Sequence, residues 1–319
     1  MIVSPLVDAA LAGVIGLLVG SFLNVVIYRL PMMMYRDWLD NYLDELVPAD
    51  GIPGLWRLVF GPASTQPKPL ADAATAALAD VRALPALTLS KPRSRCPHCG
   101  APIHWYQNIP VISWLALRGK CASCSARISV RYPIVELVTA GFFAFCVARF
   151  GVSLAAAFWI AFCCILICQF LIDVDTMMLP DALNYPLLWL GLIAAALKLT
   201  PVTLVSAVWG AVFGYLALWI VFHAYRLLTG KEGFGYGDFK LLAALGAWFG
   251  GEYLIAIILL SSIVGSIVGV GLVLAGRIAN LQVKISYGPF LAATGLVAMI
   301  LGPQGFHEYF AFAFPFDKY

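Results

Sequence analysis

Charged side chains are scarce in this chain of 319 residues. Asp, Glu, Lys and Arg together make up 12% of it, which is about half the share found in ordinary soluble domains. Hydrophobic residues make up 62%, and the mean hydropathy is +0.89. They stand in long blocks and do not alternate with polar residues, so the sequence excludes a β-barrel and predicts an all-α polytopic membrane protein.

Basic residues are also missing ahead of the first apolar block. No Lys or Arg occurs between Met1 and Asp8, and the block that follows is longer than the core of a secretory signal peptide. This pattern disfavours a cleavable signal, and we expect the block to be retained as the first membrane helix.

The apolar blocks predict about eight transmembrane helices, most of them near the roughly 20 residues that cross a bilayer. The segment at 238–250 is short and contains Gly246 and Gly250. We expect it to be either a half-span or part of a longer element with a break. The predicted spans are 6–28, 132–149, 154–173, 181–199, 202–226, 238–250, 252–276 and 286–303.

The basic residues predict the orientation of these spans. Twelve of the 20 Lys and Arg residues lie between Arg29 and Arg131. With eight spans, seventeen fall on the same side as this segment, and only Arg149, Lys198 and Lys318 fall on the other. The positive-inside rule then makes that side cytoplasmic. The net charge of +3 fits contact with anionic membrane lipid and gives no reason to expect nucleic acid as a partner.

A soluble segment at 31–131 contains two C-x2-C pairs separated by 21 residues. Two such knuckles are typical of a tetrahedral zinc site, and a reducing cytoplasm argues against disulfides. We predict a structural zinc ion bound by Cys96, Cys99, Cys121 and Cys124. His98 and His104 stand nearby as alternative ligands or as plain surface residues.

Carboxylates stand at the mouths of two predicted spans, where an ionisable group is costly unless it is paired or functional. Asp173 ends the third span, and Asp238 follows two glycines at the start of the sixth. Two carboxylates that meet at one membrane face can share a proton and activate water, as in aspartyl proteases. Asp175, two residues from Asp173, should point the opposite way on a helix. Asp181 is expected to serve at the start of the next helix.

Several patches together resemble those of type IV prepilin peptidases, which are GxGD intramembrane aspartyl proteases. The likeness extends over nearly the whole chain and is least distinctive at 37–90. The matching patches are Gly20–Asn24, Tyr28–Pro31, the two Cys pairs, Asn108–Pro110, Arg131–Leu137, Ile172–Asp173, Leu179–Asp181, Lys231–Gly233, Gly235–Lys240 and Tyr287–Phe290.

The resemblance implies that Asp173 and Asp238 are the catalytic pair; spacing alone did not separate Asp173 from Asp175. It implies cleavage of the basic leader of prepilins and pseudopilins after a glycine, at the cytoplasmic face of the bacterial inner membrane. It also implies methylation of the new N-terminus with S-adenosylmethionine. The alternatives are a transporter or channel with an aspartate ion site, and a non-catalytic scaffold.

The sequence further suggests four regions: a first transmembrane helix at 1–30, the cytoplasmic domain at 31–131, a peptidase core at 132–303 and a tail at 304–319. Residues 36–46 are expected to form an interfacial helix or an acidic dock for a basic peptide. We expect another helix at 70–84 and a loop at 52–69.

Three smaller expectations concern contacts within the membrane. The glycines at 13, 16 and 20 should allow close helix packing, and Asn24 should donate a hydrogen bond to a neighbouring helix. Glu136 should either pair with Arg131 or meet a substrate ammonium group.

Overall fold

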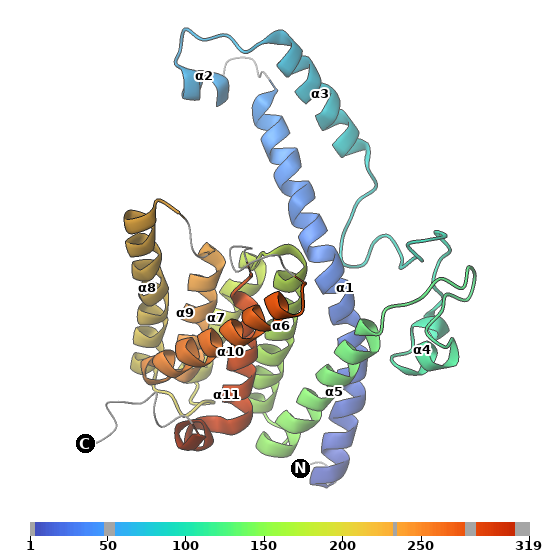
Figure 1. Ribbon diagram of the computed structural model, residues 1–319. Helices are drawn as coiled ribbons and strands as arrows, with labels where there is room; N and C mark the ends of the chain where they lie inside the picture. The colour runs from blue at the N-terminus through green and yellow to red at the C-terminus, as the bar shows by residue number, and fades with distance from the viewer. Residues whose placement is uncertain (1–3, 48–54, 232–234, 278–284, 310–319) are drawn as a thin grey trace.

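The computed structural model describes residues 4–47, 55–231, 235–277 and 285–309. These residues form helices joined by turns and loops, with no strand among them. Each predicted span falls on one helix (Figure 1). Five helices are long and apolar enough to cross a membrane. Helix α7 and the part of α11 from Gly288 to Gly302 are apolar but shorter, so a count of eight crossings remains a prediction. The bundle helices are α1 (Pro5–Leu46), α5 (Arg131–Phe150), α6 (Leu154–Thr176), α7 (Asp181–Ala196), α8 (Leu204–Thr229), α9 (Tyr236–Phe249), α10 (Leu254–Leu274) and α11 (Gly288–Tyr309), which has a kink at Gly302.

Helix α1 does not stop at the end of its apolar block. It continues through Pro31 to Leu46, and its second half stands beyond the other bundle helices (Figure 1). The helix predicted at 36–46 is confirmed and proves to be the end of α1. Its position at the membrane interface and its role as an acidic dock stay predictions.

A second helix packs along the α1 extension. Helix α3 (Lys68–Ala83) confirms the helix predicted at 70–84, and its Arg82 pairs with Asp40 at 3.0 Å and Asp44 at 2.6 Å. Helix α2 (Leu55–Phe60) interrupts the predicted loop at 52–69, whose first three residues lie outside the described part. Of the predicted tail at 304–319, residues 310–319 also lie outside it.

The apolar half of α1 packs closely against α5, as the small-residue pattern predicts. An added Cβ at Gly16 would lie 2.7 Å from the Cα of Ala140, and one at Gly20 would lie 2.7 Å from the Cα of Glu136. Asn24 donates a hydrogen bond across the interface to the carbonyl of Tyr132 at 3.2 Å. Both predictions for this interface are confirmed.

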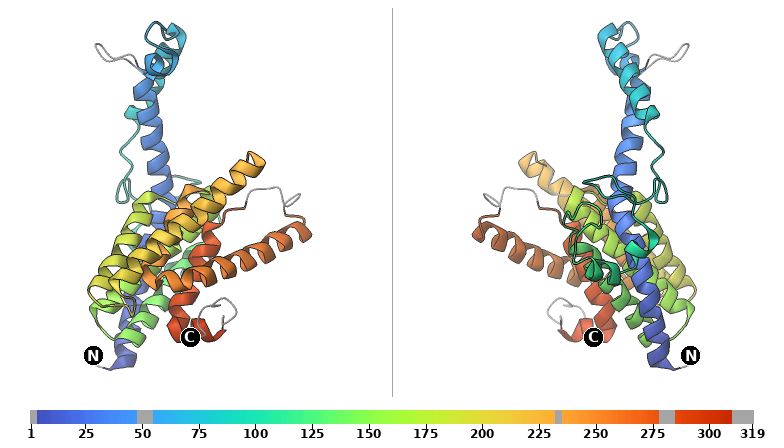
Figure 2. Two further views of the ribbon diagram at one scale, coloured as in Figure 1. Left: turned by 90° about the vertical axis from the view of Figure 1, so that its left-hand side faces the viewer. Right: turned by 90° about the vertical axis from the view of Figure 1, so that its right-hand side faces the viewer.

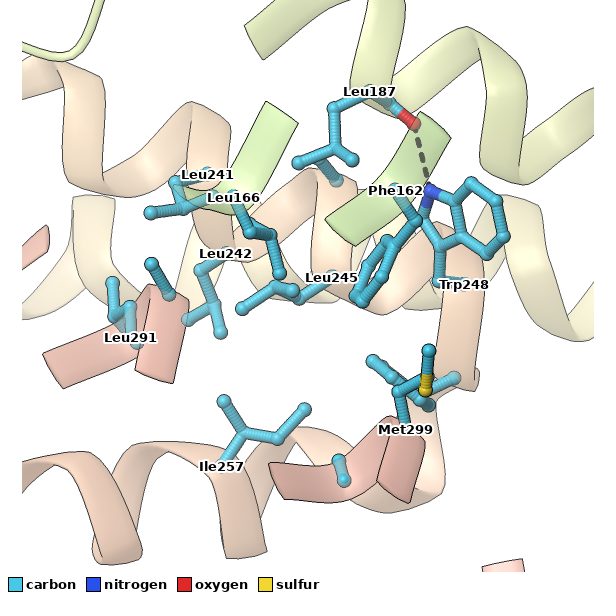
Figure 3. Close-up of a cluster of buried hydrophobic side chains, with 14 of the residues drawn as sticks. Phe162, Leu166, Leu187, Leu241, Leu242, Leu245, Trp248, Ile257, Leu291 and Met299 are labelled. Carbon is cyan, nitrogen blue, oxygen red and sulfur yellow. Dashed lines mark hydrogen bonds between the residues drawn. The ribbon is translucent and has the colours of Figure 1, made fainter. Parts of the chain in front are cut away.

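Helix α9 occupies the centre of the bundle and is buried from Phe239 to Phe249 except at Lys240. Its leucines pack between α6, α7 and α11, and the indole of Trp248 donates to the carbonyl of Leu187 at 2.8 Å (Figure 3). Fourteen residues rise about 21 Å, less than the roughly 30 Å hydrocarbon core. This enclosure explains how so short an apolar helix is accommodated.

Helix α9 ends in a sharp turn, as the glycines in this segment suggested. Gly250 has a φ of 82°, and a short 3₁₀ turn at Gly251–Tyr253 leads into α10. Helix α10 then leaves the bundle at an angle, and most of it is not buried (Figure 2). The segment is therefore an element separated from the next by a sharp turn.

Helices α8 and α9 approach each other backbone to backbone at Gly210 and Gly246. A Cβ at Gly246 would collide with the carbonyl of Gly210, and backbone cannot move aside as a side chain can. We expect Gly246→Ala to cost about 1–3 kcal/mol or more through overpacking. Thermal unfolding in detergent should show a lower midpoint.

Gly271→Ala is the matched control, because an added Cβ there meets nothing within 4 Å. Its midpoint should equal or exceed that of the wild type, because alanine is the better helix former. Equal midpoints for the two variants would contradict the backbone contact.

Candidate active site

The two aspartates singled out from the sequence come together at one end of the bundle. Asp173 lies in the last turn of α6 and is 2% exposed, while Asp238 lies in the first turn of α9 and is 7% exposed. The two carboxylates interact electrostatically. Both positions are mouths of apolar helices, where a pair of carboxylates is protected from bulk water.

Asp173 is held by the segment that leads into α11. Its Oδ2 accepts a hydrogen bond from the hydroxyl of Ser286, and its carboxylate accepts another from the backbone N–H of Gly288. A Cβ at Gly288 would overlap Oδ2 and would lie 2.8 Å from a methyl of Leu179. The glycine of the Tyr287–Phe290 patch is therefore required by the close approach of backbone to carboxylate.

Asp238 is held by its own turn. Its Oδ2 accepts a hydrogen bond from the N–H of Gly235 at 3.1 Å, while its Oδ1 is buried with no partner among the described residues. A Cβ at Gly237 would lie 2.7 Å from Cβ of Leu179. The glycines of this turn thus serve a hydrogen bond and a close packing contact within the protein.

The segment before α11 is fixed from a second direction. The hydroxyl of Tyr287 lies 2.6 Å from that of Ser261 and 3.2 Å from that of Ser262, both on α10. Tyr287 also interacts electrostatically with Asp238. This residue therefore ties the loop that contacts Asp173 to α10.

The neighbouring aspartates have other partners. Asp175 points away from Asp173, as predicted, and pairs with Arg131 at 2.8 Å. Asp181 is the first residue of α7, as predicted, but no side-chain cap is formed because Pro180 is the capping residue. Its carboxylate instead binds Lys240 at 2.6 Å, which links α7 to α9.

Glu136 binds partners that the sequence did not predict. Its Oε2 accepts a hydrogen bond from the backbone N–H of Val111 at 2.8 Å, and Ser21 of α1 also binds it. The expectation of a pair with Arg131 is wrong because Arg131 pairs with Asp175. Glu136 instead attaches the segment that contains the Asn108–Pro110 patch to the bundle.

A buried amide pair near the aspartates was not anticipated from the sequence. Gln169 Nε2 donates to Asn184 Oδ1 at 2.7 Å, and Asn184 Nδ2 donates to the carbonyl of Leu179 at 3.2 Å. Gln169 and Asn184 are 0% and 1% exposed. The signal was available, because both are amides inside apolar spans and must find partners there.

The four cysteines of the two knuckles meet in one cluster. Their Sγ atoms all lie within 4.8 Å of one another, and those of Cys96 and Cys124 are 3.8 Å apart. The two C-x2-C knuckles have the same backbone hydrogen bond. The Cys96 N–H donates to the carbonyl of Ala101 at 2.9 Å, and the Cys121 N–H donates to the carbonyl of Ala126 at 2.8 Å. Neither His98 nor His104 belongs to the cluster.

The electrostatics of this cluster differ among its thiols. Backbone N–H groups of Cys99 and His98 lower the pKa of Cys96, whereas the pKa of Cys124 is raised to about 11: the Ala126 N–H lowers it, but burial and the neighbouring thiols outweigh that effect. Backbone N–H groups of Cys124 and Ser123 point at the Cys121 sulfur and lower the pKa of its thiol to about 6. A thiolate is the form that binds metal. The cluster therefore has the donor atoms and the spacing of a four-cysteine metal site.

The fold and these two sites define a class of protein: a polytopic helical membrane protein with two buried aspartates at one end and a four-cysteine module attached there. Residues 14–150 match the model of the bacterial peptidase A24 N-terminal domain, and residues 160–270 match that of the type IV leader peptidase family. The chain belongs to the type IV leader peptidase family.

Curated relatives cover almost all of the chain. A "Prepilin leader peptidase/N-methyltransferase" of Stutzerimonas stutzeri is 45% identical over 97% of this chain and 96% of its own length. One of Pseudomonas aeruginosa gives the same identity and coverage, and one of Aeromonas hydrophila is 43% identical over 93% of this chain and 92% of its own. No solved structure matches the chain.

Proposed function

We propose that this protein removes the leader peptide of type IV prepilins and pseudopilins by hydrolysis after a glycine, and then N-methylates the new N-terminus. The observation that supports cleavage most directly is the convergence of Asp173 and Asp238 from α6 and α9. Relatives named for both activities match 97% of the chain.

The proposed chemistry needs one neutral and one charged carboxyl group. Two neighbouring carboxylates hold one shared proton, because ionising both is costly. The charged group takes a proton from water as the water attacks the scissile carbonyl carbon. The neutral group protonates the carbonyl oxygen. The group that took the proton from water then gives it to the leaving amine as the C–N bond breaks. Oδ1 of Asp238 is buried without a hydrogen-bond partner in the described part of the chain, and we assign it the hydrogen bond from this water.

The transporter or channel alternative gains nothing from the comparisons, whose matches reported above are leader peptidases. The second activity is proposed from the relatives' names, which include N-methyltransferase. S-adenosylmethionine is the methyl donor that we propose. The nucleophile is the amine released by cleavage, which gains the methyl group and loses a proton.

We propose that the cluster of four cysteines binds a structural zinc ion. Four thiolates at about 2.3 Å from a tetrahedral zinc stand about 3.8 Å apart, and the separation of 3.8 Å between Cys96 and Cys124 fits this value. Each knuckle is closed by an isolated backbone bridge of its own, and such an ion would join the two.

The location follows from the charges. We propose that the protein lies in the bacterial inner membrane with the aspartates and the four-cysteine module on the cytoplasmic side, where most basic residues are expected. The division into regions at 1–30, 31–131, 132–303 and 304–319 is retained as a proposal, although α1 itself continues to Leu46.

Loss of either aspartate should stop cleavage. Because general acid–base catalysis contributes about 10²- to 10⁴-fold, Asp173→Asn and Asp238→Asn should each reduce the cleavage rate by at least about a hundredfold. Asp175→Asn is the control, since it breaks only a half-exposed ion pair worth about 0–1 kcal/mol. Purified enzymes and a synthetic prepilin peptide, followed by mass spectrometry, give the rates. Wild-type cleavage by either of the first two variants would rule out the pair mechanism.

Protein purified without oxygen should contain about one zinc ion per chain. Replacing Cys121 with Ser should remove most of it and expose 92–130 to proteolysis, because the metal joins the knuckles. Cys164→Ser is the control, since Cys164 lies within α6 and outside the cluster. Metal analysis that finds no zinc in the wild-type protein would contradict the assignment.

Methylation should follow cleavage, because an amide nitrogen is not nucleophilic and the amine is absent from the intact prepilin. Asp238→Asn should leave full-length prepilin unmethylated yet methylate a synthetic mature peptide that begins with phenylalanine. Mass spectrometry with S-adenosylmethionine measures both products. Failure on the pre-cut peptide, with fold and zinc intact, would mean that the aspartate site is also needed for methyl transfer.

A further inference from the structure

Leu179 lies between the two segments that position the aspartates. It belongs to the connection between α6 and α7, and it would contact a Cβ at Gly237 at 2.7 Å and one at Gly288 at 2.8 Å. Gly237 precedes Asp238, and Gly288 contacts Asp173. The side chain therefore touches both halves of the site. It is only half-buried, so part of its surface stays accessible.

This side chain has little freedom to move. The backbone at Gly237 and at Gly288 packs against the Leu179 side chain from two sides. The backbone carbonyl of Leu179 accepts a hydrogen bond from the side chain of Asn184. Gln169 holds Asn184 in turn. The amide of Asn184 cannot be reversed, because its oxygen would then face the Leu179 carbonyl. Leu179 is thus a fixed wall that cannot yield to a bulky neighbour.

We propose that Leu179 is the specificity-determining residue that limits the cleaved position to glycine, and that Gln169 and Asn184 are positioning residues that hold it. The inference rests on the proposed peptidase function. A scissile carbonyl that reaches both carboxylates lies against Leu179, because this side chain bridges Gly237 and Gly288. A Cβ on the residue that supplies that carbonyl would meet the fixed isobutyl group, and glycine has no Cβ.

The test uses the full-length enzyme in detergent and two synthetic leader peptides that differ only in glycine or alanine before the scissile bond. The measured quantity is the ratio of kcat/KM for glycine to that for alanine. One misfitting methyl or methylene group changes kcat/KM by about 10- to 200-fold. The wild type should therefore prefer the glycine peptide by about tenfold or more. Leu179→Ala should lower the ratio about tenfold or more by raising kcat/KM for the alanine peptide.

Two further variants separate specificity from stability. Leu188→Ala removes the same atoms from a half-buried leucine of α7 and should leave the ratio unchanged. Asn184→Ala should lower the ratio although it touches no substrate, because it frees the carbonyl of Leu179; a merely structural role would lower the unfolding midpoint alone. If Leu179→Ala does not fold, Leu179→Val is measured in its place.

A ratio within about twofold of wild type in folded Leu179→Ala or Leu179→Val would overturn the inference, because a lost steric barrier is worth about tenfold or more. An unchanged ratio can be told apart from failure of the proposed peptidase function. If the proposed function is wrong, the wild type itself leaves the glycine peptide uncut.

Discussion

Enclosure of the short helix α9 is the constraint on which the site depends. A helix of fourteen residues is too short to face lipid over the full hydrocarbon core, and its neighbours bury it almost completely. The backbone contact between Gly210 and Gly246 and the indole hydrogen bond from Trp248 fix its position along the bundle. The first turn of α9, with Asp238, therefore stops at the depth where α6 ends with Asp173.

Two ion pairs near Asp173 and Asp238 join neighbouring helices. The pair of Arg131 with Asp175 joins α5 to α6, and that of Lys240 with Asp181 joins α9 to α7. Both pairs are partly exposed, and pairs of this kind contribute about 0–1 kcal/mol. They join neighbouring helix ends near the site, while the aspartates themselves are held by Ser286, Gly288 and Gly235.

The four-cysteine module is attached to the same end of the bundle. Glu136 of α5 binds the backbone of Val111, and Val111 has a φ of 59°, which is unusual for a β-branched residue. Such a conformation persists where the surroundings hold it. The hydrogen bond to a buried carboxylate supplies that restraint and connects the module to α1 and α5.

Local pattern and spacing in the sequence indicated the helical membrane class, the positions of the apolar helices, Asp238 and the four cysteines. They did not separate Asp173 from Asp175; the resemblance to a family made that choice, and the tertiary structure agrees with it because Asp175 pairs with Arg131. The sequence did not determine that α1 continues through Pro31, because a proline usually ends or kinks a helix. It also did not determine that Glu136 binds a backbone N–H, since that N–H belongs to a residue distant in sequence. The placement of Leu179 between Gly237 and Gly288 also arose only from tertiary structure. Three separate segments meet there, and which atoms touch is decided by packing of the whole bundle.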